Sequence, residues 1–285
     1  MASISSLFGY VLNLIYNLIH NYGLAIILFS VLLKVILLPL SIKQQKTMKK
    51  TAKMQGKIKE LQEKYKNDQM KLNQEMMDLY KKENMSPFSG CLTSILQIIL
   101  LFAMFGLVRN PLTYMKKIDN ATIEKYKTEM RQELGENSIS NNYPEISVLK
   151  YVNDYKSNED PLYINTDFFG LDLSKIPQEN LNDWTVYIIP VLYVITTFIS
   201  MQITTKMTTT QKDKNKEINN DKKEENPEEM AMQMNKSMAW FMPLMSVSIS
   251  IIAPLGLALY WLVNNILMIA ERLVLNKCIK SEEEE

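Results

Sequence analysis

The chain has 285 residues, a formal net charge of +1 and 22% charged residues, averages that would suit a soluble protein. A sliding hydropathy window instead separates long, almost uncharged apolar runs from densely charged connections, which argues against a soluble protein and predicts an all-α polytopic membrane protein. His20 is the only histidine, the two cysteines Cys91 and Cys278 are far apart, and HExxH, CxxC and GxSxG are absent. The sequence therefore predicts no metal site, cofactor, disulfide framework or catalytic residue.

The N-terminal segment, residues 1–22, carries apolar side chains at helical spacing with Ser, Asn and Tyr between them. We expect a helix that lies on the outer surface of the membrane. A true span is the alternative, because the run is about long enough to cross but is less apolar than the runs that follow. No basic region precedes a short apolar stretch with a small-residue cleavage site, so a cleaved signal peptide is not predicted.

Residues 23–42 form the first confident span, since the run from Leu24 to Leu40 contains only Ser30 and Lys34 as polar residues. Residues 43–83 then show the pattern of a helical hairpin, with an apolar, Met-rich stripe on each arm and a break at Asn67 and Asp68. Two interpretations of the stripes remain open. They pack against each other, or the flexible methionines meet varied apolar partners.

Four more apolar runs complete a predicted set of five spans: residues 91–109, 184–203, 237–253 and 255–275. The last two runs meet around Pro254 and Gly256, and so short a turn makes them antiparallel neighbours. Residues 110–183 are polar and form a predicted loop with some helix around residues 123–134. Residues 204–236 form a second polar loop, and residues 276–285 form an acidic tail.

The charges of the loops predict the orientation of the chain. Residues 43–83 hold 12 Lys and 6 Asp or Glu, whereas residues 110–183 hold 8 Lys or Arg and 13 Asp or Glu. Because Lys and Arg accumulate on the cytoplasmic side, the first segment should be cytoplasmic and the second external. Alternate threading then places the N-terminus outside and the C-terminus in the cytoplasm.

Lys34 lies about eleven residues into its span, where a lysine costs roughly 2.5–3.5 kcal/mol on insertion scales. No Asp or Glu lies well inside any predicted span to neutralise it. Either its long stem snorkels to the cytoplasmic interface, or it points into a water-filled cavity open to the cytoplasm. Polar residues from other spans that could share such a cavity are Gln97, Gln202, Asn264 and Asn265.

Each of these amides, taken alone, is more often a hydrogen-bonding contact between helices than a functional group. Trp261, several residues into the last predicted span, is either an interfacial anchor or a packing residue. The amides and the lysine together carry more weight than any one of them.

Three stretches resemble the YidC/Oxa/Alb family of membrane-protein insertases, in matching order along nearly the whole chain. They are GLAIILFSVLLKVILLPLSIKQQKTMKKTAKMQ (Gly23 to Gln55), NMSPFSGCLTSILQIILLFAMF (Asn84 to Phe105) and APLGLALYWLVNNILMI (Ala253 to Ile269). The resemblance implies five transmembrane helices that enclose a hydrophilic groove, open to the cytoplasm and to lipid but closed outside. Lys34 stands where the family usually has an arginine. Together with the polar residues inside the spans, the resemblance gives the predicted groove residues Lys34, Gln97, Gln202, Trp261, Asn264 and Asn265.

The resemblance also implies a function. The chain would be a multi-pass insertase of the bacterial plasma membrane, not an enzyme, with residues 43–83 as a mobile cytoplasmic hairpin that first receives the substrate. No nucleotide would be consumed, which fits the absence of a P-loop. A channel or solute transporter that uses Lys34 is the alternative, although the sequence shows neither internal repeats nor paired broken helices.

The implied partners are nascent membrane proteins and membrane lipid, with the ribosome and the Sec translocon as further candidates and no specific nucleic acid. The tail ends in four glutamates, whereas many five-span relatives end in a basic tail suited to ribosomal RNA. The basic hairpin is therefore the better candidate for a contact with the ribosome.

Overall fold

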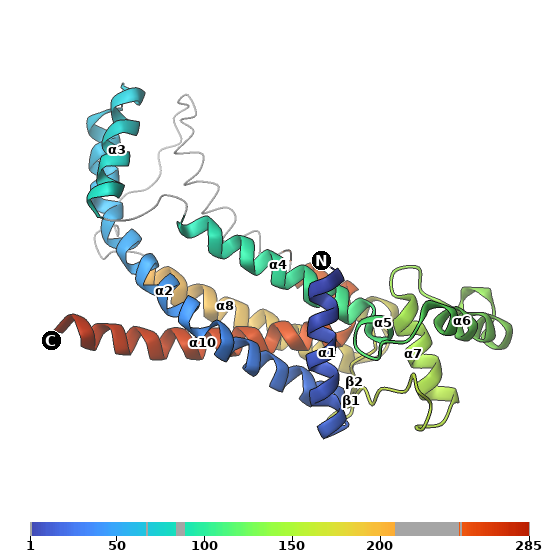
Figure 1. Cartoon of the computed structure of the whole chain (residues 1–285). Coiled ribbons are helices and arrows are strands. Elements are labelled where there is room, and N and C mark those ends of the chain that lie inside the picture. The colour runs from blue at the N-terminus through green and yellow to red at the C-terminus, as the bar shows by residue number, and fades with distance from the viewer. Residues whose placement is uncertain (1, 67, 84–88, 209–244, 246, 285) are drawn as a thin grey trace. The chain divides into compact units, whose positions relative to one another are not determined.

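The computed structural model describes residues 2–66, 68–83, 89–208, 245 and 247–284 (Figure 1). These residues are almost entirely helical, and the only strands among them are the two that form one short hairpin. The chain divides into two compact units. The larger unit comprises residues 1–35, 99–198 and 225–267, and the smaller unit comprises residues 36–98, 199–224 and 268–285.

Four helical stretches in the described part of the chain are long and apolar enough to cross a membrane: Ala2–Ile19, Tyr22–Thr47, Trp184–Ile203 and Leu255–Asn276. The last three coincide with predicted spans. The predicted span 91–109 lies in helix α4 (Ser89–Arg109), whose residues Ile98–Arg109 form a shorter apolar helix. Most of the predicted span 237–253 lies outside the described residues, although residues 247–252 are helical. These helices confirm the predicted fold class, an all-α polytopic membrane protein.

Two helices continue through the predicted boundaries of their spans. Helix α2 (Tyr22–Lys64) includes both the apolar run and the first arm of the hairpin, with Pro39 inside it. Helix α10 (Leu255–Glu284) likewise continues into the predicted acidic tail. At each boundary the side chains change from apolar to charged while the helix continues. Hydropathy detects this change although the backbone does not break there.

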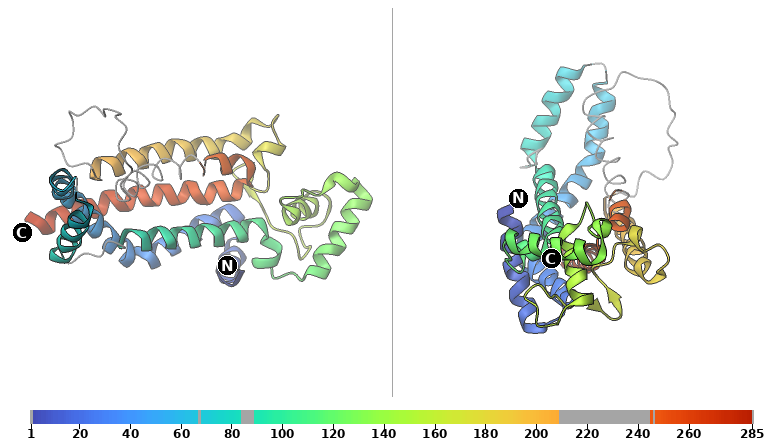
Figure 2. Two further views of the ribbon diagram at one scale, coloured as in Figure 1. Left: turned by 90° about the horizontal axis from the view of Figure 1, so that it is seen from above. Right: turned by 90° about the vertical axis from the view of Figure 1, so that its right-hand side faces the viewer.

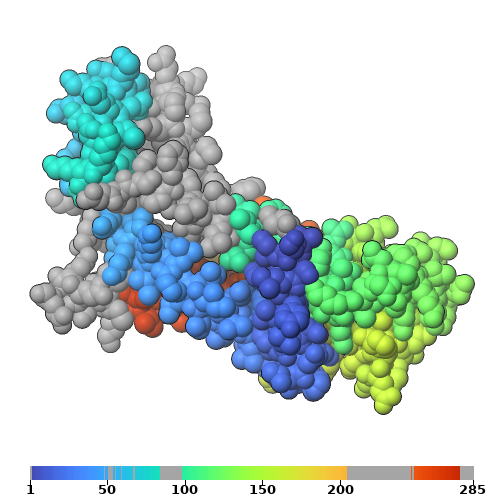
Figure 3. Space-filling view, viewed as in Figure 1, coloured from blue at the N-terminus to red at the C-terminus, as the bar shows by residue number. Residues whose placement is uncertain are grey.

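Helix α1 (Ala2–Ile19) lies across α4 and the first part of α2 in the larger unit, rather than alongside them (Figures 1 and 2). The Ser5 hydroxyl donates a hydrogen bond to the Ala103 carbonyl of α4 at 2.9 Å. The Phe8 ring packs edge-on against Phe29 of α2, with 5.5 Å between centroids. Figure 3 shows the surface of α1 in direct contact with that of the residues around α4. The placement of residues 1–22 on the membrane surface stays a prediction.

Residues 110–183, hereafter the loop domain, fold into short helices and a β hairpin within the larger unit, although the sequence predicted a polar loop. Its helices are α5 (Pro111–Tyr114), α6 (Asn120–Leu134) and α7 (Pro144–Tyr155), with 3-10 turns at Glu136–Ser138 and Pro177–Glu179. Strands β1 (Asp167–Phe168) and β2 (Leu171–Asp172) form the hairpin, and the 3-10 turn η3 (Trp184–Tyr187) leads into α8 (Ile188–Thr208). The helix expected around residues 123–134 is confirmed as α6.

The loop domain has an apolar core and one buried carboxylate. Core side chains with at most 1% exposure are Leu112, Met115, Val148, Leu149, Tyr151, Val152, Leu162, Ile164 and Leu173. The buried carboxylate of Glu145 accepts hydrogen bonds from the backbone N–H of Thr113 at 3.0 Å and from its hydroxyl at 2.5 Å. Burial raises the pKa of Glu145, against the lowering effect of these bonds. The bonds fasten α7 to α5, because a buried carboxylate needs such partners.

The loop domain also holds the start of α2. The backbone N–H of Tyr22 donates to the carbonyl of Asn165 at 3.0 Å, and the Asn165 side chain donates to the carbonyl of His20 at 3.1 Å. The Asn165 N–H donates in turn to the Tyr16 hydroxyl of α1 at 2.8 Å. His20 itself has a positive φ of 55°. One residue of the loop domain, Asn165, therefore fixes the turn between α1 and α2.

The start of α10 is held by the same domain. The N–H groups of Leu255 and Gly256 donate to the carbonyls of Lys175 and Leu173, each at 2.9 Å. The first N–H groups of a helix have no partner within it, so these carbonyls supply what the helix lacks. A Cβ on Gly256 would lie 3.2 Å from the Tyr22 ring, which shows how closely the starts of α2 and α10 approach.

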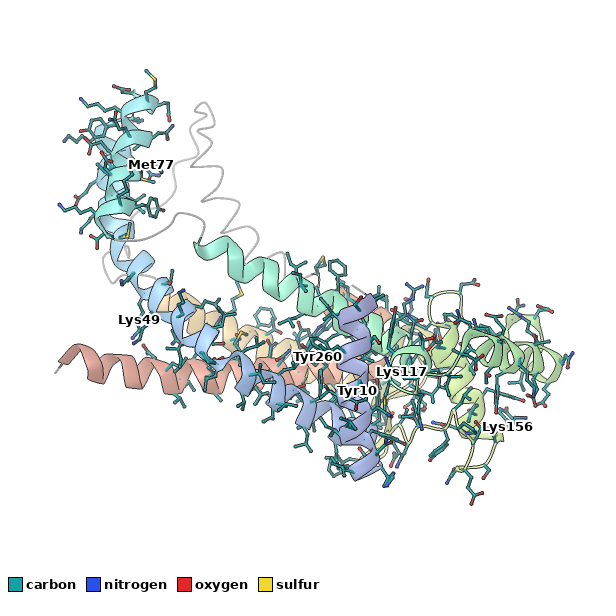
Figure 4. The ribbon with its side chains drawn as sticks, in the orientation of Figure 1. Tyr10, Lys49, Met77, Lys117, Lys156 and Tyr260 are labelled. Atoms are coloured by element: carbon teal, nitrogen blue, oxygen red, sulfur yellow. The ribbon has the colours of Figure 1, made fainter. Side chains whose placement is uncertain are left out.

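In the smaller unit the hairpin arms pack against each other. Met54 and Ile58 of α2 form a buried cluster with Leu72 and Met76 of α3 (Gln69–Lys82), surrounded by Leu61, Tyr65, Leu79 and Tyr80. Asp68 caps α3 by accepting the Lys71 N–H at 3.0 Å, as the predicted break requires. The interpretation that the stripes pack together is confirmed. Met70 and Met77 stay exposed, and Figure 4 labels the second.

We expect Gly9→Ala to destabilise the larger unit, because a Cβ at residue 9 would lie 2.1 Å from the Tyr114 carbonyl oxygen of α5. Overpacking of this kind costs about 1–3 kcal/mol. The matched control is Gly56→Ala on α2, where a Cβ meets nothing within 4 Å. That change should be neutral or stabilising by up to about 1 kcal/mol. Thermal unfolding of both variants in detergent is the measurement, and equal Tm values would contradict the close crossing of α1 and α5.

We also expect a pH dependence from Asp183, whose carboxylate accepts a hydrogen bond from the Lys175 ammonium at 2.7 Å and from Thr185. These bonds lower the pKa of Asp183 from 3.8 to about 2. Because the unfolded chain binds the proton more readily, the stabilisation is present above pH 3.8 and is lost as pH falls toward about 2. The difference in stability between wild type and Asp183→Asn, from denaturant titrations, should shrink over that interval. A constant difference would contradict the ion pair.

Candidate functional site

The predicted site residues come from four helices and from both units. Lys34 lies on α2, and Trp261, Asn264 and Asn265 lie on α10, all four within the larger unit. Gln97 on α4 and Gln202 on α8 belong to the smaller unit. The side chain of Gln97 lies outside the described part of the structure, and that of Gln202 is exposed. That these two residues join Lys34 in one groove stays a prediction.

Lys34 extends the inward-facing side of α2. Ile26 and Ser30 are almost fully buried, and Lys34 follows Ser30 by four residues, so it lies on the same side of the helix. The Ser30 hydroxyl is satisfied by the Ile26 carbonyl at 2.8 Å. Lys34 is half-buried, whereas Val35 and Ile36 are 62% and 63% exposed. The position matches that of intramembrane lysines, which generally face other helices or a water-filled cavity.

Asn265 connects two helices of the larger unit. Its side-chain amide donates to the Thr197 hydroxyl of α8 at 2.7 Å. The neighbouring Asn264 lies one turn after Tyr260 of α10, a residue that Figure 4 labels. Thr197 was not singled out in the sequence. Its signal was the pair of threonines at 196 and 197 within an apolar run, which is weak because threonine is common in membrane helices.

Trp261 is a packing residue in this structure. Its side chain is 7% exposed, and its ring lies 5.8 Å from the ring of Tyr193 on α8. An interfacial anchor would instead expose its ring at the helix end. Trp261 and Asn265 are four residues apart, so both face α8 from one side of α10.

The described residues contain no group of three or more His, Cys, Asp or Glu side chains that could hold a metal ion. What the geometry offers instead is a set of polar side chains on apolar helices, held by helix starts that the loop domain fixes. Such side chains can offer hydrogen bonds, and Lys34 a positive charge, to a polar or charged group. Fold and site together define an all-α polytopic membrane protein with polar residues inside its spanning helices.

Comparison with known proteins narrows this class. A family model described as "60Kd inner membrane protein" matches residues 14–283. The chain therefore belongs to this family, the YidC/Oxa/Alb family that its sequence resembles.

Curated relatives agree with the family model. The chain is 27% identical, over 99% of its own length and all of the relative, to "Membrane protein insertase YidC" of Caldanaerobacter subterraneus subsp. tengcongensis. It is 29% identical, over 98% of its length, to the protein of the same name from Treponema denticola. A shorter match with the protein from Syntrophus aciditrophicus is 47% identical over 33% of the chain. The chain spans 38% of the Treponema relative and 17% of the Syntrophus relative.

A double-mutant cycle tests whether Asn265 joins α10 to α8 through its hydrogen bond with Thr197. Thr197→Ala, Asn265→Ala and the double variant should show a coupling energy of about 0.6 kcal/mol, and at most about 1.7 kcal/mol, as measured for hydrogen bonds between membrane helices. Unfolding in mixed micelles supplies the free energies. A coupling near zero would contradict the hydrogen bond between α8 and α10.

Proposed function

We propose that the protein is a membrane-protein insertase. It receives nascent hydrophobic segments in a hydrophilic groove and releases them into the bilayer without nucleotide hydrolysis. The observation that carries the proposal is the place of Lys34, half-buried on the inward side of a spanning helix whose other side exposes apolar residues. Membership of the family and the printed names of the relatives, "Membrane protein insertase YidC", support it.

The mechanism needs no covalent step. A nascent segment with a short polar or acidic flank enters from the cytoplasm, and water in the groove lowers the cost of taking that flank out of bulk solvent. The charge of Lys34 attracts the flank while the groove amides offer hydrogen bonds. Release follows because the apolar part gains about 0.8 kcal/mol for each CH₂ group that leaves water for lipid.

A groove that is open to the cytoplasm and closed outside fits the structure of the larger unit. The loop domain binds the starts of α2 and α10 through Asn165, Leu173 and Lys175, which leaves that end of the unit filled by a folded domain. We assign this end to the outside, in agreement with the acidic charge of residues 110–183. The same assignment places residues 1–22 at the outer surface and both the hairpin and the C-terminus in the cytoplasm.

The hairpin of residues 43–83 is the proposed first contact for the nascent chain and the ribosome. Its 12 lysines give it a basic surface, and Met70 and Met77 add flexible apolar side chains that are 86% and 49% exposed. Basic side chains attract ribosomal RNA without reading its sequence, and methionine adapts to varied apolar segments. The Sec translocon is a further candidate partner.

The test is insertion of a single-span substrate with an acidic flank, in cells depleted of their own insertase. Two unit charges about 4 Å apart attract by about 1–4 kcal/mol at effective dielectric constants between 80 and 20. Lys34→Ala should therefore lower insertion at least about fivefold, and Lys34→Arg should keep it because the charge remains. Lys150→Ala on α7, an exposed lysine of the loop domain, is the matched control.

Normal insertion by Lys34→Ala would overturn the electrostatic role. Loss of insertion in both Lys34→Ala and Lys150→Ala would indicate a general defect in folding or abundance, which membrane levels of each variant distinguish. A channel or transporter would show itself by conductance or solute flux in liposomes that hold the purified protein alone.

A further inference from the structure

The turn of the β hairpin carries an unusual residue, Phe169, at its first central position. Phe169 and Gly170 connect β1 to β2, with φ values of 52° and 81°. Two positive values identify a turn of type I′, whose first position normally holds Asn, Asp or Gly. A bulky aromatic residue at positive φ is an outlier that costs conformational energy, and such outliers collect where a residue has a task.

The same residue also lacks the burial that would explain an aromatic side chain. Phe169 is 86% exposed, and its ring centroid lies 4.7 Å from that of Phe168. Phe168 packs against the start of α2, since a Cβ on Gly23 would lie 2.3 Å from its ring. The hairpin is therefore anchored at the start of α2 and presents the Phe169 ring outward.

Two more exposed apolar side chains belong to the segment that joins the hairpin to α8. Strand β2 packs against η3, which begins with Trp184, and Trp184 is 73% exposed. Leu181, shortly before it, is 68% exposed. We call Phe169, Leu181 and Trp184 the apolar rim. The rim lies at the starts of α2 and α8, and both helices continue from it with exposed apolar residues, among them Leu28, Val191 and Ile195.

We propose that the apolar rim inserts into the interfacial region of the bilayer, on the side where α2 and α8 begin. Lipid is the occupant because the rim continues the lipid-facing surface of both helices, and because aromatic side chains favour the boundary between headgroups and acyl chains. Asp167 and Asp172 pair across the hairpin beside the turn, so attraction to anionic headgroups does not drive insertion. The rim fixes the depth of the loop domain and, through Leu173 and Lys175, that of the start of α10.

The experiment places an environment-sensitive fluorophore on Phe169→Cys in the full chain, with Cys91→Ser and Cys278→Ser. The labelled protein is reconstituted in phosphatidylcholine vesicles that carry a nitroxide either near the headgroup or near the end of the acyl chain. We expect blue-shifted emission, stronger quenching by the shallow nitroxide, and protection from aqueous iodide. The matched control is Gln132→Cys on α6, which Figures 1 and 2 place far from the spanning helices. Iodide should quench the fluorescence of this label, and neither lipid-borne nitroxide should.

Phe169→Asn separates insertion from turn formation. Asn suits the left-handed conformation, so the hairpin should form at least as well without the ring. A label on Leu181→Cys should then lose part of its quenching by the shallow nitroxide. Unchanged quenching at Leu181 would assign Phe169 to the turn alone and overturn its role in the rim.

Two other results would overturn the proposal for lipid. Quenching of the Phe169 label by iodide but not by lipid nitroxide would place the rim in water. Protection from both quenchers that grows with the ratio of protein to lipid would show that a second copy of the chain covers it. Neither result depends on insertase activity, so the proposed function stands or falls separately.

Discussion

Backbone groups that enter a bilayer must find their hydrogen bonds within the protein, and a helix always leaves its first N–H groups without an internal partner. In this chain the loop domain supplies hydrogen-bond acceptors to the first N–H groups of two helices. The carbonyls of Lys175 and Leu173 receive the first N–H groups of α10, and the carbonyl of Asn165 receives that of Tyr22. Asn21 completes the second cap, since its side chain accepts the Leu24 N–H at 3.0 Å. The positions of both helices depend on these bonds.

The caps matter for the polar residues further along. Trp261 and Asn265 follow the cap of α10 by about two to three turns, so α10 carries them as a rigid extension of the loop domain. Lys34 follows the cap of α2 by about three turns in the same way. A domain that sequence patterning treats as a connection therefore supports the candidate site, because it sets the height and rotation of the helices that bear it.

The sequence predicted what local periodicity encodes. Apolar runs located the described spans, and the stripes with Met54, Ile58, Leu72 and Met76 predicted a hairpin whose arms pack together. It did not predict the loop domain, because that core joins residues far apart in the chain. Glu145 shows the difficulty: its partner Thr113 is 32 residues away, and a lone glutamate among polar neighbours is ordinarily solvent-exposed.

The candidate site, too, could be predicted only in part from the sequence. Lys34 and Asn265 could be found in the sequence because a polar residue inside an apolar run is expensive. The partner of Asn265 could not, since Thr197 carries little such cost and the pair is 68 residues apart. Which amides share a groove depends on packing between helices, and a single sequence contains no information of that kind.

The place of Lys34 on α2 bears on whether the proposed groove holds water. Lys34 lies on the inward side of α2, whereas the exposed Val35 and Ile36 face elsewhere, which favours the proposed water-filled cavity over snorkelling along the lipid-facing surface. An ammonium is compact and strongly hydrated, and it loses its proton more readily than a guanidinium when water is removed. In the proposed mechanism, water in the groove keeps this charge hydrated while it attracts the acidic flank.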